Sequence, residues 1–269
     1  MNRIAALFAL CFFPLLVQGQ EHSVAAKTLV FSHVTIIDAT GAPPQPDKTV
    51  VIEGARIVRI SSAQGAPPAE NAETVDARGL YLIPGLWDMH VHVWDANLAF
   101  PLFLANGVTS VRNTGGHPED LQHWRKDIAA GVRVGPNLIA CGPVLDGDPP
   151  IHPDHSVVIH NAAEGHAAVD SLQTNGWDFV KVYDNLSRDA YFSIAAEAKT
   201  RHIPFVGHVP LSVTAIEASN SGQKSIEHLD GLAYVTSPLG EQFRRARLER
   251  IGKPAKPGEM MKLPLRIAG

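Results

Sequence analysis

The sequence predicts an α/β fold in which a parallel (β/α) barrel follows a small partial β-sandwich. From Leu82 onward, short apolar runs alternate with stretches of helical spacing, which is typical of a parallel sheet covered by helices. Before Leu82, short alternating segments are separated by Gly and Pro, which indicates a small sandwich. With 45% hydrophobic residues, the 269-residue chain can bury a sizeable core, and we expect one main domain and a minor one.

Residues 1–19 have the pattern of a secretory signal peptide. Met1-Asn2-Arg3 supplies a positive start, and the residues from Ile4 to Val17 form an apolar run. This run is shorter than the ~20 residues that a membrane anchor needs, and no small residue of the kind that a lipoprotein cleavage site requires stands before Cys11. We therefore expect a periplasmic or secreted protein with no stable membrane anchor.

Charge and cysteine content narrow the partners and the chemistry. The net charge is −4 and Lys and Arg are dispersed, so the sequence has no electrostatic footprint for nucleic acid, and we expect a small-molecule substrate. Removal of residues 1–19 leaves Cys141 as the one cysteine. This excludes an internal disulfide and a cysteine-based zinc site, so a metal would have to be held by His, carboxylate and modified Lys.

Residues 20–80 are expected to form the partial β-sandwich. Alternating segments occur at 29–37 and 49–52, and residues 52–60 have the pattern of a hairpin that turns at Glu53-Gly54. We expect this region to be structural.

Residues 81–235 are expected to form an incomplete (β/α)8 TIM-type barrel with about six of its strands. The expected strands are 82–92, 108–113, 137–142, 178–183, 204–208 and 225–229, and the expected helices are 98–105, 118–130, 162–174, 187–201 and 211–219. Residues 236–269 are expected to form a basic helix at 241–250 and an irregular tail. In such barrels the active site lies at the carboxyl ends of the strands, so polar residues at those ends are the candidate site.

The most informative motif is His90-Val91-His92, at the end of the first expected barrel strand. Residues two apart on a strand lie on one face about 7 Å apart, so both imidazoles can converge on one ion. The alternative is one structural and one surface histidine, because this short motif is common.

Lys181, His208 and His228 lie in or at the end of similar strand-like runs. Strand alternation places Lys181 in the barrel interior with Phe179 and Tyr183, where an unpaired ammonium is costly. The alternative is a lysine whose aliphatic stem packs while its ammonium reaches solvent.

In residue types, order and strand context, these residues resemble the amidohydrolase superfamily, in particular its imidazolonepropionase-like and Xaa-Pro dipeptidase-like branch. The resemblance covers about residues 28–234 and includes residues 107–113, which are similar to the family's second barrel strand. It implies two divalent metals, with Zn²⁺ favoured by the ligand types and manganese, cobalt or iron as alternatives. It implies that carbamylated Lys181 bridges them, with His90 and His92 on one metal and His208 and His228 on the other.

The resemblance implies hydrolysis of a C–N bond, in an amide or peptide, by a hydroxide that bridges the two metals. The implied substrates are dipeptides, cyclic amides or N-acyl compounds. Tyr183 would position the substrate carbonyl, with core packing as its alternative role. Asp88, two positions before His90, would orient a ligand or make a structural hydrogen bond.

The loop at 146–155 is expected at the mouth of the site, where its polar side chains contact substrate or are simply solvated. Its His152 and His155 are weaker ligand candidates, because they lie in an irregular, proline-rich stretch. Asn113 stands where relatives often have Asp, which weakens any charge-dependent role there.

The family's general acid–base, an Asp at the end of the eighth strand, has no evident counterpart. Asp230 follows the sixth strand, and Glu241, Glu249 and Glu259 lie in the tail. One alternative is therefore a truncated, catalytically inactive remnant that binds metal or a small molecule. Another is a homo-oligomer in which a partner copy closes the barrel.

Overall fold

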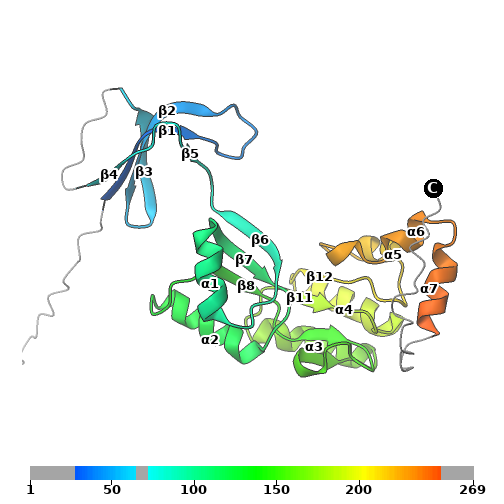
Figure 1. The fold of residues 1–269 in the computed structure, drawn as a ribbon. Coiled ribbons are helices and arrows are strands. Elements are labelled where there is room, and N and C mark those ends of the chain that lie inside the picture. Colours follow the sequence, from blue (N-terminus) through cyan, green and yellow to red (C-terminus); the bar gives the residue numbers. More distant parts are fainter. Residues whose placement is uncertain (1–27, 65–71, 250–269) are drawn as a thin grey trace, which may run out of the picture. The chain divides into compact units, whose positions relative to one another are not determined.

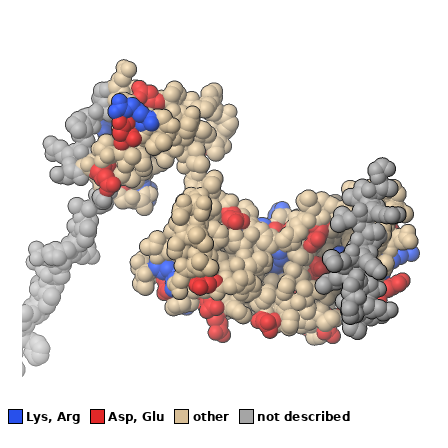
Figure 2. Space-filling model, viewed as in Figure 1, with Lys and Arg blue, Asp and Glu red and all other residues tan. Residues whose placement is uncertain are grey.

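The computed structural model describes residues 28–64 and 72–249, so the expected signal peptide and the end of the tail lie outside the described residues. The chain divides into two compact units, Met1–Pro84 and Gly85–Gly269. Within the described ranges, no helix has the length and apolar character needed to cross a bilayer. Figure 2 shows basic and acidic side chains interspersed on the visible surface.

The first unit contains a five-stranded sheet with the order β3-β2-β1-β4, in which β5 also pairs with β1 (Figure 1). The expected hairpin is present, because Glu53 pairs with Arg56 across the turn. Its described strands form this one sheet, and a second layer of the expected sandwich is not among them. The strands are β1 (Thr28–Ile36), β2 (Gln45–Glu53), β3 (Arg56–Ser62), β4 (Glu73–Asp76) and β5 (Tyr81–Leu82).

The second unit is a mixed α/β structure with two parallel sheets, ordered β6-β7-β8 and β10-β9-β11-β12 (Figure 1). The strands are β6 (Leu86–Val91), β7 (Val108–Asn113), β8 (Asn137–Ala140), β9 (Val144–Asp146), β10 (Ser156–Val158), β11 (Val180–Val182) and β12 (Phe205–Gly207). The helices are α1 (Ala96–Ala105), α2 (Pro118–Ala129), α3 (Ala162–Thr174), α4 (Arg188–Thr200), α5 (Ala215–Asn220), α6 (Leu232–Thr236) and α7 (Gly240–Leu248).

Five of the six expected barrel strands correspond to β6, β7, β8, β11 and β12. The prediction of a sixth strand at 225–229 is wrong beyond Ile226. Ile226 makes an isolated parallel bridge to Gly207, and a 3₁₀ helix, η2 (Glu227–Leu229), follows. His228 has a φ of 57°, in the left-handed region, so the strand ends before it.

The loop at 146–155 has more regular structure on either side than its composition predicts. Strands β9 and β10 flank it in one parallel pair, and a 3₁₀ helix, η1 (Pro153–His155), ends it. Strands of three residues are too short to give a recognisable alternating pattern.

The helices cover the outer face of the parallel strands. Val180 and Val182 belong to the main core with residues such as Leu121, Tyr191 and Ile194 from the helices. Phe179, on the opposite face of β11, lies in a separate small cluster with Cys141 and Val206. This is the alternation that the sequence predicts around Lys181.

Gly207 permits the close approach of β12 to β11 next to His208. Its φ is 140°, and a Cβ atom there would lie 2.1 Å from the Val182 carbonyl oxygen. A larger residue would push the two strands apart.

Glu217 completes the capping box of α5 and pairs with Arg188. Its carboxylate accepts hydrogen bonds from Arg188 at 2.7 Å and from the Thr214 backbone N–H at 2.9 Å. These two interactions, that of Arg188 first, lower the pKa of Glu217 to about 2. We expect Glu217→Gln to lower the free energy of unfolding by about 1 kcal/mol at neutral pH, a small value because the side chain is 35% exposed.

The pH dependence has a definite sign. The pKa of Glu217 is lower in the folded chain than its ordinary value of 4.5, so its stabilisation is present above that value and is lost as the pH falls toward about 2. Urea unfolding of wild type and Glu217→Gln should therefore differ less at about pH 3 than at pH 7. An equal difference at both pH values would contradict the assignment.

Candidate metal centre

His90 and His92 point to one side at the end of β6, as strand alternation predicts. Their Nε2 atoms are 3.3 Å apart, and their ring centroids are 5.2 Å apart. The Asp88 carboxylate accepts a hydrogen bond from the His90 backbone N–H at 3.1 Å. Asp88 thus makes a local structural hydrogen bond.

The protonation of both rings follows from their partners. His90 Nδ1 lies 2.6 Å from Glu227 Oε2, and His92 Nδ1 lies 3.0 Å from the Gly115 carbonyl oxygen. Carboxylate and carbonyl oxygens accept hydrogen bonds, so each Nδ1 carries the proton and donates. Burial, the largest cause, lowers the pKa of both histidines, which favours the neutral rings.

The two Nε2 atoms therefore carry lone pairs and cannot donate to each other. The Thr114 hydroxyl lies 3.4 Å from His92 Nε2, at the outer limit of hydrogen bonding. Zinc–nitrogen distances of about 2.0–2.1 Å at a tetrahedral angle require about 3.3–3.4 Å between two ligand nitrogens. The His90–His92 separation fits this requirement, so the pair suits a cation.

Lys181 lies in the middle of β11 and is 1% exposed. Its Nζ has no hydrogen-bond partner among the residues that the structure describes. Burial, the largest cause, lowers the pKa of Lys181 to about 8. The Lys181 ammonium is close enough to contribute by charge repulsion to the lowered pKa of His90 and His92. Burying an amine without a hydrogen-bond partner beside neutral imidazoles costs free energy unless another group binds there.

His208 follows β12, and two carboxylates that the sequence analysis did not select hold its ring. Its Nδ1 lies 2.8 Å from Asp184 Oδ1 and 2.9 Å from Asp230 Oδ2. Burial lowers the pKa of His208, but these two hydrogen bonds outweigh it and raise the pKa above its ordinary value. The His208 Nε2 is buried and has no partner in the described part of the chain.

Asp184, His208 and Asp230 bring three ligand-type atoms within 4.8 Å of one another. We interpret them as an ion-paired brace, because His208 Nδ1 already bonds to both carboxylates. A carboxylate on one imidazole nitrogen typically orients the other nitrogen toward a metal. These three residues form no recognisable sequence motif, so their proximity could not be predicted from the sequence.

His228 lies beside His90 and His208, with ring-centroid distances of 4.5 and 5.1 Å. Its left-handed backbone in η2, and not a strand end, places it there. The structure thus gathers His90, His208 and His228 with Lys181 beside them, although their roles as metal ligands stay predictions.

Glu227 and Arg112 form a buried network that the sequence analysis missed. Glu227 is 6% exposed and accepts hydrogen bonds from His90 and, at 2.7 Å, from Arg112. Arg112 also donates to the Met89 carbonyl at 2.6 Å and to the Ser225 hydroxyl at 3.1 Å. The ion pair therefore ties β6 and β7 to the segment that follows β12.

Asn113 supports the same region without a charge. Its side-chain oxygen accepts from the Val93 backbone N–H at 2.8 Å, and its amide donates to the Gly115 carbonyl at 2.9 Å. That carbonyl also accepts from His92. The neutral amide supplies both a donor and an acceptor, which an ionised Asp would not.

Tyr183 stacks on His208 with a centroid distance of 3.9 Å. Its hydroxyl lies 3.1 Å from His152 Nε2, in the loop at 146–155. Burial, the largest cause, raises the pKa of Tyr183 to about 12, so the phenol keeps its proton. The loop is thus in contact with the candidate centre through His152.

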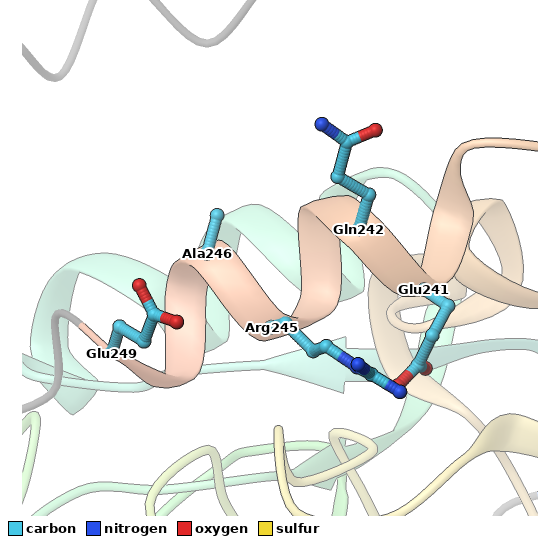
Figure 3. Close-up of a pocket in the computed structure, with 5 residues that line it drawn as sticks. All are labelled: Glu241, Gln242, Arg245, Ala246 and Glu249. Atoms are coloured by element: carbon cyan, nitrogen blue, oxygen red, sulfur yellow. The ribbon is translucent and has the colours of Figure 1, made fainter.

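A surface pocket of about 490 Å³ lies along α7, away from these residues (Figure 3). Glu241 and Arg245 form an ion pair on its wall at 2.8 Å. None of the candidate ligands lines it, so it is not part of the candidate centre. Its lining residues are Glu241, Gln242, Arg245, Ala246 and Glu249.

Comparisons with known proteins agree with this fold. An adenine deaminase from Rubrobacter xylanophilus is 29% identical over 89 residues, 33% of this chain and 14% of that protein. A dihydroorotase from Trichlorobacter lovleyi is 40% identical over 58 residues, 22% of this chain and 13% of that protein. No protein-family model matches the chain.

Solved structures extend the similarity over most of the chain. Bottromycin amidohydrolase matches with a TM-score of 0.65 and 27% identity, over 80% of this chain and 46% of that one. A Xaa-Pro dipeptidase with bound methionine in its active site matches with a TM-score of 0.63 and 20% identity, over 80% of this chain and 64% of that one. The chain spans about half the length of the amidohydrolase and less than two thirds of the dipeptidase.

The fold and the candidate centre define a parallel α/β protein whose ligand-type side chains come from β6, β11, β12 and the segments that follow them. In local sequence and in fold, the chain is similar to proteins of the amidohydrolase superfamily, which confirms the resemblance predicted from its residues. The names of these relatives are those of enzymes that hydrolyse carbon–nitrogen bonds.

Proposed function

We propose that this protein is a metal-dependent amidohydrolase that hydrolyses the C–N bond of a small molecule such as a dipeptide, a cyclic amide or an N-acyl compound. The observation that carries the proposal is the 3.3 Å separation of the His90 and His92 Nε2 atoms, whose Nδ1 atoms are both engaged as donors. The apolar pattern of residues 1–19 supports a periplasmic or secreted location.

We assign one metal, with zinc favoured, to His90, His92 and Lys181, and a second to Lys181, His208 and His228, in an incomplete barrel. Bound zinc lowers the pKa of water to about 7 and polarises a carbonyl group. The ring tautomers support the assignment, because Glu227 and the Gly115 carbonyl occupy the Nδ1 side of His90 and His92. Asp184 and Asp230 do the same for His208.

Lys181 joins such a site as a carbamate. Its neutral amine attacks carbon dioxide, the N–C bond forms as one C=O π bond opens and its electron pair moves to oxygen, and one amine proton leaves to solvent, so that the side chain becomes an anion. Burial favours this reaction, because it lowers the pKa of Lys181 to about 8 and so increases the neutral fraction. The carbamate oxygens would also provide the buried end of this side chain with the interactions that the Lys181 Nζ lacks among the described residues.

Tyr183 is assigned to the substrate carbonyl. Its phenol remains protonated at neutral pH and can donate a hydrogen bond. His152 Nε2 lies against the hydroxyl and holds it in place.

A second candidate function is metal binding without turnover. Each carboxylate that contacts a candidate ligand side chain already accepts a hydrogen bond from a histidine: Glu227 from His90, and Asp184 and Asp230 from His208. Protonation of any of these three would weaken the hydrogen bond that it accepts from its histidine.

The test uses the full chain prepared with bicarbonate and Zn²⁺. We expect two metal equivalents by mass spectrometry and hydrolysis within a panel of dipeptides, cyclic amides and N-acyl amino acids. His90→Asn should remove about one equivalent, since it deletes a ligand. The matched control is His166→Asn, because His166 on α3 also pairs with a glutamate, Glu197 on α4, and neither residue is part of this centre.

Metal binding with no hydrolysis across the panel would favour the second candidate. Equal metal content in wild type and His90→Asn would overturn the assignment of the centre.

A further inference from the structure

Four ring side chains outside the five assigned metal ligands form a continuous arc beside the centre, and two of them are the weaker ligand candidates of the loop at 146–155. We name them the aromatic arc: Trp94, His155, His152 and Tyr183. Trp94 lies just after β6, both histidines lie in the loop at 146–155, and Tyr183 lies just after β11.

Each member of the aromatic arc contacts the next. The ring centroids are 5.4 Å apart for Trp94 and His155, 5.0 Å for His155 and His152, and 5.3 Å for His152 and Tyr183. The first pair is edge-to-face at 67°, and the second is stacked at 20°. These are separations at which aromatic rings attract one another.

Both ends of the aromatic arc meet a candidate ligand. Trp94 lies nearly parallel to His92, with an angle of 9° and a centroid distance of 6.2 Å. Tyr183 stacks on His208 at 3.9 Å. The arc therefore runs from one candidate ligand, His92, to another, His208.

Hydrogen bonds to Asp146 and from Asn185 hold the loop that carries the two histidines. The Asp146 carboxylate, which is fully buried, accepts from the Ile151 and Asn185 backbone N–H groups at 2.8 Å each. The Asn185 amide donates to the Pro149 carbonyl at 2.6 Å. The arc is thus held in place before any ligand binds.

The aromatic arc consists of four rings without a permanent charge, and the Lys181 Nζ lies 5.8 Å from the Tyr183 ring centroid. The arc contains no Lys, Arg, Asp or Glu side chain. Within residues 28–64 and 72–249, the cluster of three metal-ligating groups is Asp184, His208 and Asp230, and the histidines of the arc do not converge on such a point. Trp94 is 54% exposed, so its ring is accessible to a ligand.

We propose that the aromatic arc is a binding subsite for a neutral aromatic or heteroaromatic ring of the substrate. This inference rests on the proposed function and narrows its substrate class to amides that carry such a ring next to the scissile bond. Trp94 would supply the main contact, because its ring is the most apolar of the four and is accessible.

The experiment measures binding of benzamide and cyclohexanecarboxamide to the full metal-loaded chain by titration calorimetry. The two probes share the amide and the ring size, and only benzamide is aromatic. We expect wild type to bind benzamide about three- to tenfold more tightly than its saturated partner. Trp94→Ala should abolish this preference, and Trp94→Phe should retain most of it.

Trp87→Ala is the matched control, because Trp87 is a tryptophan of β6 that is 50% exposed and lies outside the aromatic arc. It should leave the preference unchanged. His155→Leu, which removes the neighbour of Trp94, is a second variant that should reduce it. Persistence of the preference in Trp94→Ala, or an equal loss in Trp87→Ala, would overturn the subsite.

The experiments distinguish failure of the aromatic subsite from failure of the proposed hydrolase function. A preference for benzamide that depends on Trp94, in a chain that hydrolyses nothing, would support the subsite and count against the enzyme. Hydrolysis of aliphatic and aromatic amides at equal kcat/KM, with no effect of Trp94→Ala, would keep the enzyme and reject the subsite.

Discussion

Lys181→Met is expected to lower the metal content from two equivalents to at most one and to reduce hydrolysis by about 10³-fold or more, which corresponds to about 4 kcal/mol of transition-state stabilisation. Methionine matches the length of lysine but cannot form a carbamate. Metal analysis and steady-state kinetics of the full chain check this result.

The same substitution is expected to stabilise the metal-free chain by about 1–3 kcal/mol. Lys181 is 1% exposed, and its Nζ has no hydrogen-bond partner within the described residues. Methionine therefore removes a desolvated amine and keeps the packing of the side chain. Lys199→Met is the control, because Lys199 is an exposed lysine of α4. Unchanged metal content in Lys181→Met, or a loss of stability without metal, would contradict the role given to Lys181.

Replacing Glu227 should separate its structural role from its effect on the centre. Glu227→Leu leaves Arg112 buried without its partner and is expected to cost about 3–5 kcal/mol of the free energy of unfolding. Glu227→Gln keeps hydrogen-bonding atoms in place and should cost less. It should nevertheless weaken zinc binding by about 10- to 100-fold, because the carboxylate no longer orients His90.

Glu197→Gln is the matched control for this change. Glu197 also contacts one histidine and one arginine, His166 at 2.9 Å and Arg201 at 2.8 Å, but it does not touch a candidate ligand. Denaturant unfolding and competitive zinc titration should show a stability loss for both Gln variants and a loss of zinc affinity for Glu227→Gln alone. Equal zinc affinity in the two variants would show that Glu227 acts on folding only.

The parts of the centre that follow local rules could be predicted from the sequence. Period-two alternation places His90 and His92 on one side of β6 and puts Lys181 opposite Val180 and Val182. The strand–helix alternation gives five of the parallel strands and the helices close to their actual bounds. These properties are short-range, because they depend only on the order of residues that are close in the sequence.

The rest of the centre depends on contacts between residues far apart in the chain. Glu227 meets His90 across 137 sequence positions, and His208 meets Asp184 across 24. The position of His228 depends on a left-handed backbone that no glycine or asparagine signals. No periodic pattern encodes such pairs, so Glu227, Arg112 and Asp184 were missed, and the contact of Asp230 with His208 was not predicted.

The Arg112–Glu227 ion pair joins residues that are 115 positions apart. Contacts of such long sequence separation form late in folding, because the intervening strands and helices must first be ordered. During synthesis, a nascent chain that has not reached Glu227 leaves Arg112 and His90 without their shared partner. The structural support of the centre therefore requires the whole chain from β6 through Glu227.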